Sequence, residues 1–183
     1  AMLRNIDRDM GRLFAKLKEL ELDDNTLVVF TSDNGPHQEG GHKADFFKSS
    51  GPLRGKKRDL YEGGIRSPTI VRWPGHVAAN SQSDHISGFQ DWFETFGAIA
   101  SQSVETEDGI SLAPTLIPYA DAQQSHAHLY WEFLEQGGKQ AVLRGDWKAV
   151  RLNRTNNPNG PLELYDLSKD PGEQNNVAPS NAD

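Results

Sequence analysis

Asp33, Asn34 and Lys57 are the residues of this 183-residue sequence whose types and spacing best suit chemistry on an anion. Asp33 and Asn34 directly follow the apolar run 26–31, and Lys57 lies on a later loop flanked by glycines. A carboxylate and an amide carbonyl are hard oxygen ligands, which suit Ca²⁺ or Mg²⁺ better than a soft metal. An ammonium on a loop that lets the backbone approach a ligand neutralises a sulfate or phosphate oxygen. The pattern therefore predicts a metal ion and an oxyanion side by side.

Each of these motifs also has an ordinary structural interpretation. Asp-Asn-Gly after a strand is a good turn sequence, and a lysine in a basic loop is commonly a solvated surface residue. The spacing matches no EF-hand loop, so a self-contained calcium loop is not indicated. We expect Glu62 to hold the loop by pairing with a nearby cation. Arg54 is a candidate substrate-binding residue, and the full set of cations that compete with Lys57 for the anion is Arg54, Lys56, Arg58 and Arg66.

Two histidines follow the predicted metal ligands in a glycine-rich segment. His37 and His42 flank a Gln-Glu-Gly-Gly stretch. Two histidines in a flexible loop are weak support for zinc, which takes four ligands in a structural site. We therefore treat His37 and His42 as candidate substrate contacts, with a plain surface loop as the alternative.

The elements around these residues indicate an α/β fold. Residues 2–20 carry apolar side chains at three- and four-residue steps, which predicts an amphipathic helix. After a turn, the β-branched run 26–31 is typical of a central strand buried on both faces of a sheet. Ligands of such sheets collect beyond the carboxyl ends of the strands, where Asp33 and Asn34 lie.

The rest of the chain divides into two parts. Residues 35–64 have little periodicity and are expected to form a long functional loop. Beyond it we expect a strand at 68–73 and helices at 89–99 and 111–117. Short apolar runs separated by turns then predict a small antiparallel sheet, with strands at 129–133, 140–143, 147–152 and 162–165. We therefore predict an α/β part in residues 1–121 and an antiparallel-sheet subdomain in residues 122–183.

The composition argues against several classes of protein. The net charge of −7 disfavours a generic nucleic-acid binder, whose affinity comes mostly from neutralising phosphates. Because the sequence has no cysteine, a disulfide, a thiolate metal site and a cysteine nucleophile are excluded within it. No apolar run reaches the roughly 18–20 residues of a membrane span. The first residues enter an amphipathic helix at once, so we expect no signal peptide and a start within a domain.

Taken together and in order, these motifs resemble the C-terminal part of the type I sulfatases, the arylsulfatase family of the alkaline phosphatase-like superfamily. The resemblance covers nearly the whole chain. The segments that carry it are 27–35, 51–68, 73–75, 108–111, 145–148 and 163–173.

The resemblance implies both a fold and a site. The fold is the C-terminal part of an alkaline phosphatase-like α/β/α sandwich, followed by a small antiparallel β-sheet subdomain. The family counterparts of Asp33 and Asn34 bind the active-site calcium with two acidic residues from the N-terminal half, so we expect Ca²⁺ rather than Mg²⁺. The counterpart of Lys57 binds the sulfate group and acts in catalysis. The nucleophile of the family is a hydrated formylglycine, made from the first residue of a Cys/Ser-x-Pro-x-Arg motif, which attacks sulfur.

We expect that nucleophile to lie outside this sequence. There is no cysteine, and we expect the similar stretch Ser49–Arg54, read from Ser49, to have the wrong spacing and to lie in the wrong half of the family's order. The resemblance thus implies a hydrolase that releases sulfate from sulfated carbohydrates or aryl sulfate esters, completed by an N-terminal half of the catalytic domain. We expect the 183-residue chain alone to be inactive. Analogy with the family places the protein in the periplasm or outside the cell.

Two alternatives stay open. A phosphodiesterase or phosphonate hydrolase of the same superfamily is expected to place histidine ligands for zinc around Asp33, whereas an Asp-Asn pair fits calcium better. A non-catalytic relative would use the loop around His37 and Lys57 to bind sulfated glycans without turnover.

Overall fold

The computed structural model describes residues 2–117 and 122–181, which fold as two compact units that alternate along the chain. The first unit comprises Ala1–Phe30 and Thr69–Ser125, and the second comprises Thr31–Pro68 and His126–Asp183. The predicted boundary after residue 121 falls at the end of residues 118–121, outside the described residues, and stays a prediction.

The first unit is mainly helical. The amphipathic helix predicted at the start of the chain is confirmed as α1, Met2–Glu19, and the later elements lie close to their predicted positions. In chain order these elements are the 3-10 helix Asp23–Asn25, β1 (Val28–Thr31), whose last residue belongs to the second unit, β2 (Thr69–Arg72), α4 (Asp91–Ile99) and α5 (Ala113–Leu116). Among the helices of the described residues, none has the combination of length and apolar character needed to span a membrane.

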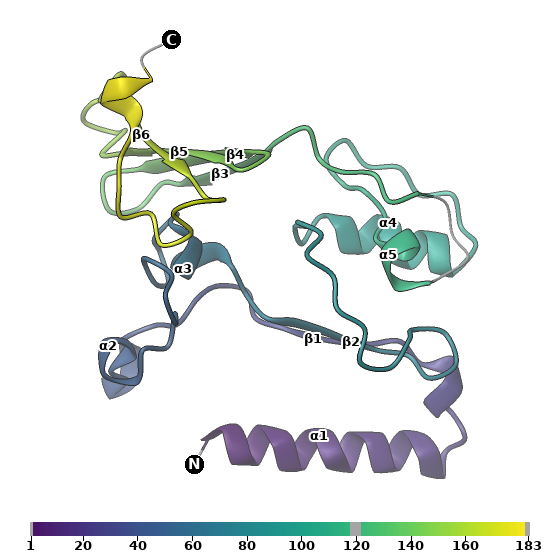
Figure 1. Ribbon diagram of the computed structural model, residues 1–183. Coiled ribbons are helices and arrows are strands. Elements are labelled where there is room, and N and C mark those ends of the chain that lie inside the picture. Colours follow the sequence, from purple (N-terminus) through teal and green to yellow (C-terminus); the bar gives the residue numbers. More distant parts are fainter. Residues whose placement is uncertain (1, 118–121, 182–183) are drawn as a thin grey trace. The chain divides into compact units, whose positions relative to one another are not determined.

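The expected burial of β1 on both faces is wrong. β1 pairs with β2 in a two-stranded sheet (Figure 1). Phe30 is 39% exposed, and the other residues of β1 are half-buried. A strand is buried on both faces only where other elements cover both, and among the described strands β2 is the single neighbour of β1.

Charged and polar side chains tie the elements of the first unit together. Arg72 on β2 forms a bidentate pair with Asp23, with Nη1 and Nη2 at 2.8 and 2.9 Å from the two carboxylate oxygens. The buried Asp91 fixes the start of α4: its carboxylate accepts hydrogen bonds from the backbone N–H groups of Gly88 (2.7 Å) and Ile110 (2.9 Å).

The predicted antiparallel sheet is confirmed in the second unit. Its four strands follow one another in the order β3-β4-β5-β6 (Figure 1). The strands are β3 (Leu129–Phe133), β4 (Lys139–Arg144), β5 (Trp147–Leu152) and β6 (Glu163–Asp166), and a 3-10 helix, Ala178–Ser180, follows. The register pairs Lys148 of β5 with Tyr165 of β6.

The segment predicted as a long loop contains three helical turns and packs on this sheet. The turns are the 3-10 helix Glu39–Gly41, α2 (Ala44–Phe47) and α3 (Glu62–Ile65). Leu60 and Tyr61, just before α3, are buried against Ala141, Val150 and Tyr165 of the sheet. The hydrophobic core of the second unit therefore connects the Lys57 loop to the C-terminal strands.

Candidate functional site

Four of the predicted site residues line one cavity of the second unit. Asp33, Asn34, His37 and Lys57 share a cavity of about 460 Å³. The remaining lining residues are Ser32, Gly35, Pro36, Ser49, Ser50, Leu53, Gly63, Arg66 and Pro68. The structure thus brings the two oxygen ligands and the cation together, as their spacing predicted.

Close backbone contacts hold the cavity walls together. The backbone N–H of Gly35 donates to the carbonyl of Gly64 (2.8 Å), and that of Lys57 donates to the carbonyl of Pro36 (2.9 Å). A Cβ atom at Gly35 would lie 1.9 Å from the carbonyl oxygen of Gly63, so only glycine permits this approach. The glycines around the site therefore bring the segment after β1 against α3.

Asp33 and Asn34 supply hard oxygen atoms to the cavity. The Asn34 amide donates a hydrogen bond to the Asp33 carboxylate, which keeps the two side chains adjacent. Their donor chemistry suits Ca²⁺, but that ion takes 6–8 oxygen ligands. Among the described residues, no group of three or more histidines and carboxylates could hold a metal ion. The pair therefore fits part of a calcium site, and further ligands have to come from other groups.

Lys57 lines the cavity and forms an ion pair with a carboxylate. Its Nζ lies 3.4 Å from Glu39 Oε2, while Glu39 Oε1 accepts from Arg58 Nη1 at 2.6 Å. The hydrogen bond and charge of Arg58, helped by Lys57, hold the pKa of Glu39 below its ordinary value. Glu39 thus stays ionised beside Lys57 at neutral pH, and an arriving anion has to compete with it.

A series of contacting rings begins at the cavity wall. His37 lines the cavity, and its ring centroid lies 5.7 Å from that of His42. His42 stacks on Phe47 at 5.5 Å, and Phe46 meets Phe47 edge-on at 5.0 Å. Phe46 and Phe47 are 77% and 64% exposed. The structure therefore places His42 one ring behind His37, outside the residues that line the cavity.

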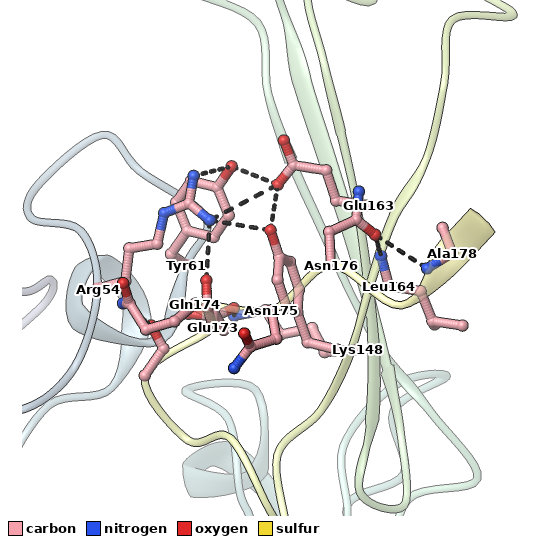
Figure 2. Close-up of polar contacts among 12 residues, drawn as sticks. Arg54, Tyr61, Lys148, Glu163, Leu164, Glu173, Gln174, Asn175, Asn176 and Ala178 are labelled. Atoms are coloured by element: carbon pink, nitrogen blue, oxygen red, sulfur yellow. Dashed lines mark hydrogen bonds and ion pairs between the residues drawn. The ribbon is translucent and has the colours of Figure 1, made fainter. Parts of the chain in front are cut away.

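Arg54 lies in a polar cluster rather than among the cavity-lining residues. Its Nη1 donates to the Tyr165 hydroxyl and to the carbonyl of Glu173, both at 2.9 Å, and Nη2 donates to the Tyr61 hydroxyl at 3.0 Å (Figure 2). Both tyrosines donate to Glu163 Oε2, at 2.6 and 2.7 Å. Burial, together with Glu163, raises the pKa of Tyr61 and raises that of Tyr165 to about 12. Arg54 thus connects the loop before Lys57 to β6 and the C-terminal segment.

Glu62 holds the loop, as expected, but through partners that the sequence did not reveal. Its Oε1 lies 2.8 Å from Lys148 Nζ, and its Oε2 lies 2.9 Å from Arg66 Nε. Lys148 Nζ also lies 3.0 Å from Glu173 Oε1, and Glu173 Oε2 accepts from the backbone N–H of Glu62 at 2.7 Å. The one available signal was the place of Lys148 beside apolar residues in a strand-like run.

Ser50 begins a stretch with the spacing of the family's nucleophile motif. Residues 50–54 read Ser-Gly-Pro-Leu-Arg and so have the Ser-x-Pro-x-Arg spacing. Ser50 lines the cavity, with its hydroxyl donating to the carbonyl of Gly55 at 2.8 Å. The expected mismatch in spacing is therefore wrong when the motif is read from Ser50. The remaining argument against a nucleophile motif here is its place in the chain, after Asp33 and Asn34.

Comparisons with known proteins find similarity along nearly the whole chain. A family model described as Sulfatase matches residues 1–102, and one described as N-sulphoglucosamine sulphohydrolase, C-terminal, matches residues 55–182. The N-acetylgalactosamine-6-O-sulfatase of Bacteroides thetaiotaomicron is 32% identical over 197 residues, which cover 97% of this chain and 37% of that protein. Human arylsulfatase A is 33% identical over 199 residues, which cover 96% of this chain and 38% of that protein.

A solved structure has a similar fold. The crystal structure of Ps i-CgsB in complex with k-i-k-neocarrahexaose matches with a TM-score of 0.78 and 31% identity, covering 99% of this chain and 38% of that one. The chain thus spans less than two fifths of the length of these relatives.

Proposed function

The chain belongs to the sulfatase family, and from this premise we propose that it forms the anion-binding and metal-holding part of a sulfuric ester hydrolase. The proposed reaction releases inorganic sulfate from sulfated carbohydrates or aryl sulfate esters. The observation that carries the proposal is the cavity shared by Asp33, Asn34 and Lys57. Hard oxygen ligands beside an ammonium suit a sulfate group, whose oxygens bind both a hard cation and a hydrogen-bond donor.

The residues of this chain have distinct proposed roles. Lys57 binds a sulfate oxygen. Because its ammonium is already in place, it stabilises the negative charge that develops on the sulfate group in the transition state. Asp33 and Asn34 hold the calcium ion together with ligands from outside this chain. When bound, calcium neutralises charge on the sulfate oxygens. The formylglycine nucleophile is also proposed to come from outside these residues, in a protein of the periplasm or the extracellular space.

Sulfated carbohydrates are the substrate class that we favour. The relative with the matching crystal structure is in complex with k-i-k-neocarrahexaose, and the Bacteroides relative is named as a sulfatase of N-acetylgalactosamine. In this chain His37 lines the cavity and begins the series of rings that continues through His42 to Phe47. We assign His37 to contact with the sugar that bears the sulfate, with His42 and Phe47 beside the neighbouring sugar.

Ligand binding by the 183-residue chain tests the site. Calorimetric titrations with Ca²⁺ and with inorganic sulfate are expected to show weak binding, because part of the proposed site lies outside this chain. Asp33→Ala is expected to reduce the calcium affinity further, and Lys57→Ala the sulfate affinity. Lys169→Ala is the matched control, since that lysine is 80% exposed and pairs with Asp166. Unchanged affinities in both site variants would overturn the proposal. Preference for phosphate over sulfate, with zinc in place of calcium, would instead indicate a phosphodiesterase or phosphonate hydrolase.

Turnover tests where the nucleophile lies. The purified chain is expected not to hydrolyse an aryl sulfate such as 4-methylumbelliferyl sulfate. Measurable turnover that Ser50→Ala abolishes would show that the chain carries its own nucleophile. A loss of two mass units at Ser50, measured by peptide mass spectrometry, would identify the conversion of its CH₂OH group to an aldehyde.

A further inference from the structure

We propose that Arg66 is a second cation for the bound anion, positioned by a buried relay of three charged residues: Glu62, Lys148 and Glu173. This inference rests on the proposed function, because it assigns one more contact to the same anion site. It also gives the C-terminal sheet a role in that site.

Arg66 has the position and the free donors for such a contact. It lines the cavity that also contains Lys57, and its side chain is 55% exposed. Its Nε forms an ion pair with Glu62 Oε2 at 2.9 Å. The two terminal nitrogens of Arg66 have no hydrogen-bond partner within residues 2–117 and 122–181. A guanidinium with Nε fixed presents those two nitrogens in a set direction, the geometry that suits two oxygens of one oxyanion.

Glu62 is itself fixed from two sides. Its Oε1 contacts Lys148 Nζ (2.8 Å), and its backbone N–H donates to Glu173 Oε2 (2.7 Å). Because Glu62 is the first residue of α3, these contacts set where that helical turn begins. The second carboxylate oxygen of Glu62 is then left for Arg66.

Burial makes this relay rigid. The side chains of Lys148 and Glu173 are 0% exposed, and that of Glu62 is 5% exposed. Charged groups away from water interact strongly and are costly to separate. With both carboxylates ionised, the two carboxylates and one ammonium of the relay carry one net negative charge, and the Arg66 guanidinium is the cation beside it.

The same sheet also holds the loop that carries Lys57. Lys139 Nζ on β4 donates to the carbonyl of Arg58 (2.7 Å) and to Asp59 Oδ1 (3.1 Å). Arg54, at the start of the loop, is held by Tyr165 on β6 at 2.9 Å. The two cations of the cavity, Lys57 and Arg66, are therefore both positioned from β4, β5, β6 and the segment that follows.

Sulfate affinity of the 183-residue chain at low salt tests the role of Arg66. Arg66→Ala is expected to weaken sulfate binding by about tenfold, the loss of one charge-assisted contact. Arg66→Lys is expected to restore only part of it, because an ammonium lacks the guanidinium fork. Arg144→Ala, which removes another exposed arginine of the same unit, is expected to leave sulfate binding unchanged.

A double-mutant cycle tests the relay. Glu173→Gln keeps the shape of the side chain and is expected to weaken sulfate binding in the wild-type background but not in the Arg66→Ala background. Circular dichroism confirms that each variant is folded. Equal losses in both backgrounds would overturn the relay, because Glu173 would then act independently of Arg66.

The outcomes separate this inference from the proposed function. One outcome is that the wild type binds sulfate, while Lys57→Ala weakens this binding and Arg66→Ala does not. In that case the assignment of Arg66 as a second cation is wrong, and the proposed function stands. If the wild type binds no sulfate, the proposed function fails, and this inference fails with it.

Discussion

Lys148 and Glu62 are 86 positions apart in the sequence, yet Lys148 Nζ lies 2.8 Å from Glu62 Oε1 at a point where neither side chain is more than 5% exposed. Lys148 points inward from β5 and Glu62 begins α3. The pair therefore joins the wall of the anion cavity to the C-terminal sheet. Because both side chains are buried, a change to either one leaves a charge away from water.

Removal of the Lys148 charge is expected to destabilise the protein strongly. Lys148→Met leaves the buried Glu173 without its cation and leaves Glu62 with Arg66 alone; breaking a buried ion pair costs about 3–5 kcal/mol. Urea denaturation at pH 7 measures the change. The exposed Lys169→Met is the control, and we expect it to cost less than about 1 kcal/mol because its ion pair is at the surface. Equal costs for the two variants would contradict the role of Lys148.

Glu173 is expected to make stability depend on pH. Burial raises the pKa of its carboxyl above the ordinary 4.5, with the charge of Glu62 adding to the effect and Lys148 opposing it. A raised pKa means that the folded state binds the proton more tightly. This contribution to stability is therefore complete below pH 4.5 and is lost as the pH rises through the raised pKa.

Glu173→Gln removes the titrating carboxyl group, so this pH-dependent contribution to stability is lost. Urea midpoints measured from pH 4 upward are expected to fall less steeply with pH in this variant than in the wild type. Glu105→Gln, which removes an exposed carboxylate of the first unit, is the matched control. Parallel profiles for wild type and Glu173→Gln would show that Glu173 has the same pKa in the folded and unfolded states.

The sequence predicted which residues meet at the cavity better than it predicted the contacts that support them. Asp33 and Lys57 belong to local motifs, a strand end and a glycine-flanked loop, whose chemistry is visible without the fold. Lys148 instead occupies an inward position of β5, next to Ala149 and Val150, and its partners depend on the register between strands. Alternation along a strand identifies such a buried position, but it does not name the carboxylate that pairs with it.

For strand β1, the residue types predicted the strand but not its burial. Its apolar, β-branched residues predicted a strand, and that strand forms at Val28–Thr31. Their expected burial depended on neighbouring elements that residue types do not reveal, and β2 alone pairs with β1 among the described strands. Residue types thus set the local conformation, whereas the number of covering elements sets the burial.

Gly35 is expected to tolerate no side chain. In Gly35→Ala the new Cβ would meet the carbonyl oxygen of Gly63 at 1.9 Å, so the segment after β1 has to move away from α3. We expect a loss of about 1–3 kcal/mol, typical of overpacking, together with weaker sulfate binding. Gly11→Ala in α1 meets no atom within 4 Å and is expected to stabilise the helix by up to about 1 kcal/mol. A Gly35→Ala variant with wild-type stability would show that the two segments separate at little cost.

Phe47 is expected to contribute to oligosaccharide binding without affecting sulfate itself. Its ring stacks on His42 and is 64% exposed, on the series of rings that begins at the cavity. The apolar face of a sugar ring packs well on such a surface, and an aromatic contact contributes about 0.5–1.5 kcal/mol. Phe47→Ala should therefore weaken the binding of k-i-k-neocarrahexaose, the oligosaccharide of the matching crystal structure, by about two- to tenfold, the fold-change equivalent to that energy. Calorimetry with inorganic sulfate should show no change.

Phe93→Ala, which removes a ring that is 62% exposed in the first unit, is the control. An equal loss of sulfate and oligosaccharide affinity in Phe47→Ala would instead show that the ring supports the cavity wall, because only a direct sugar contact distinguishes the two ligands.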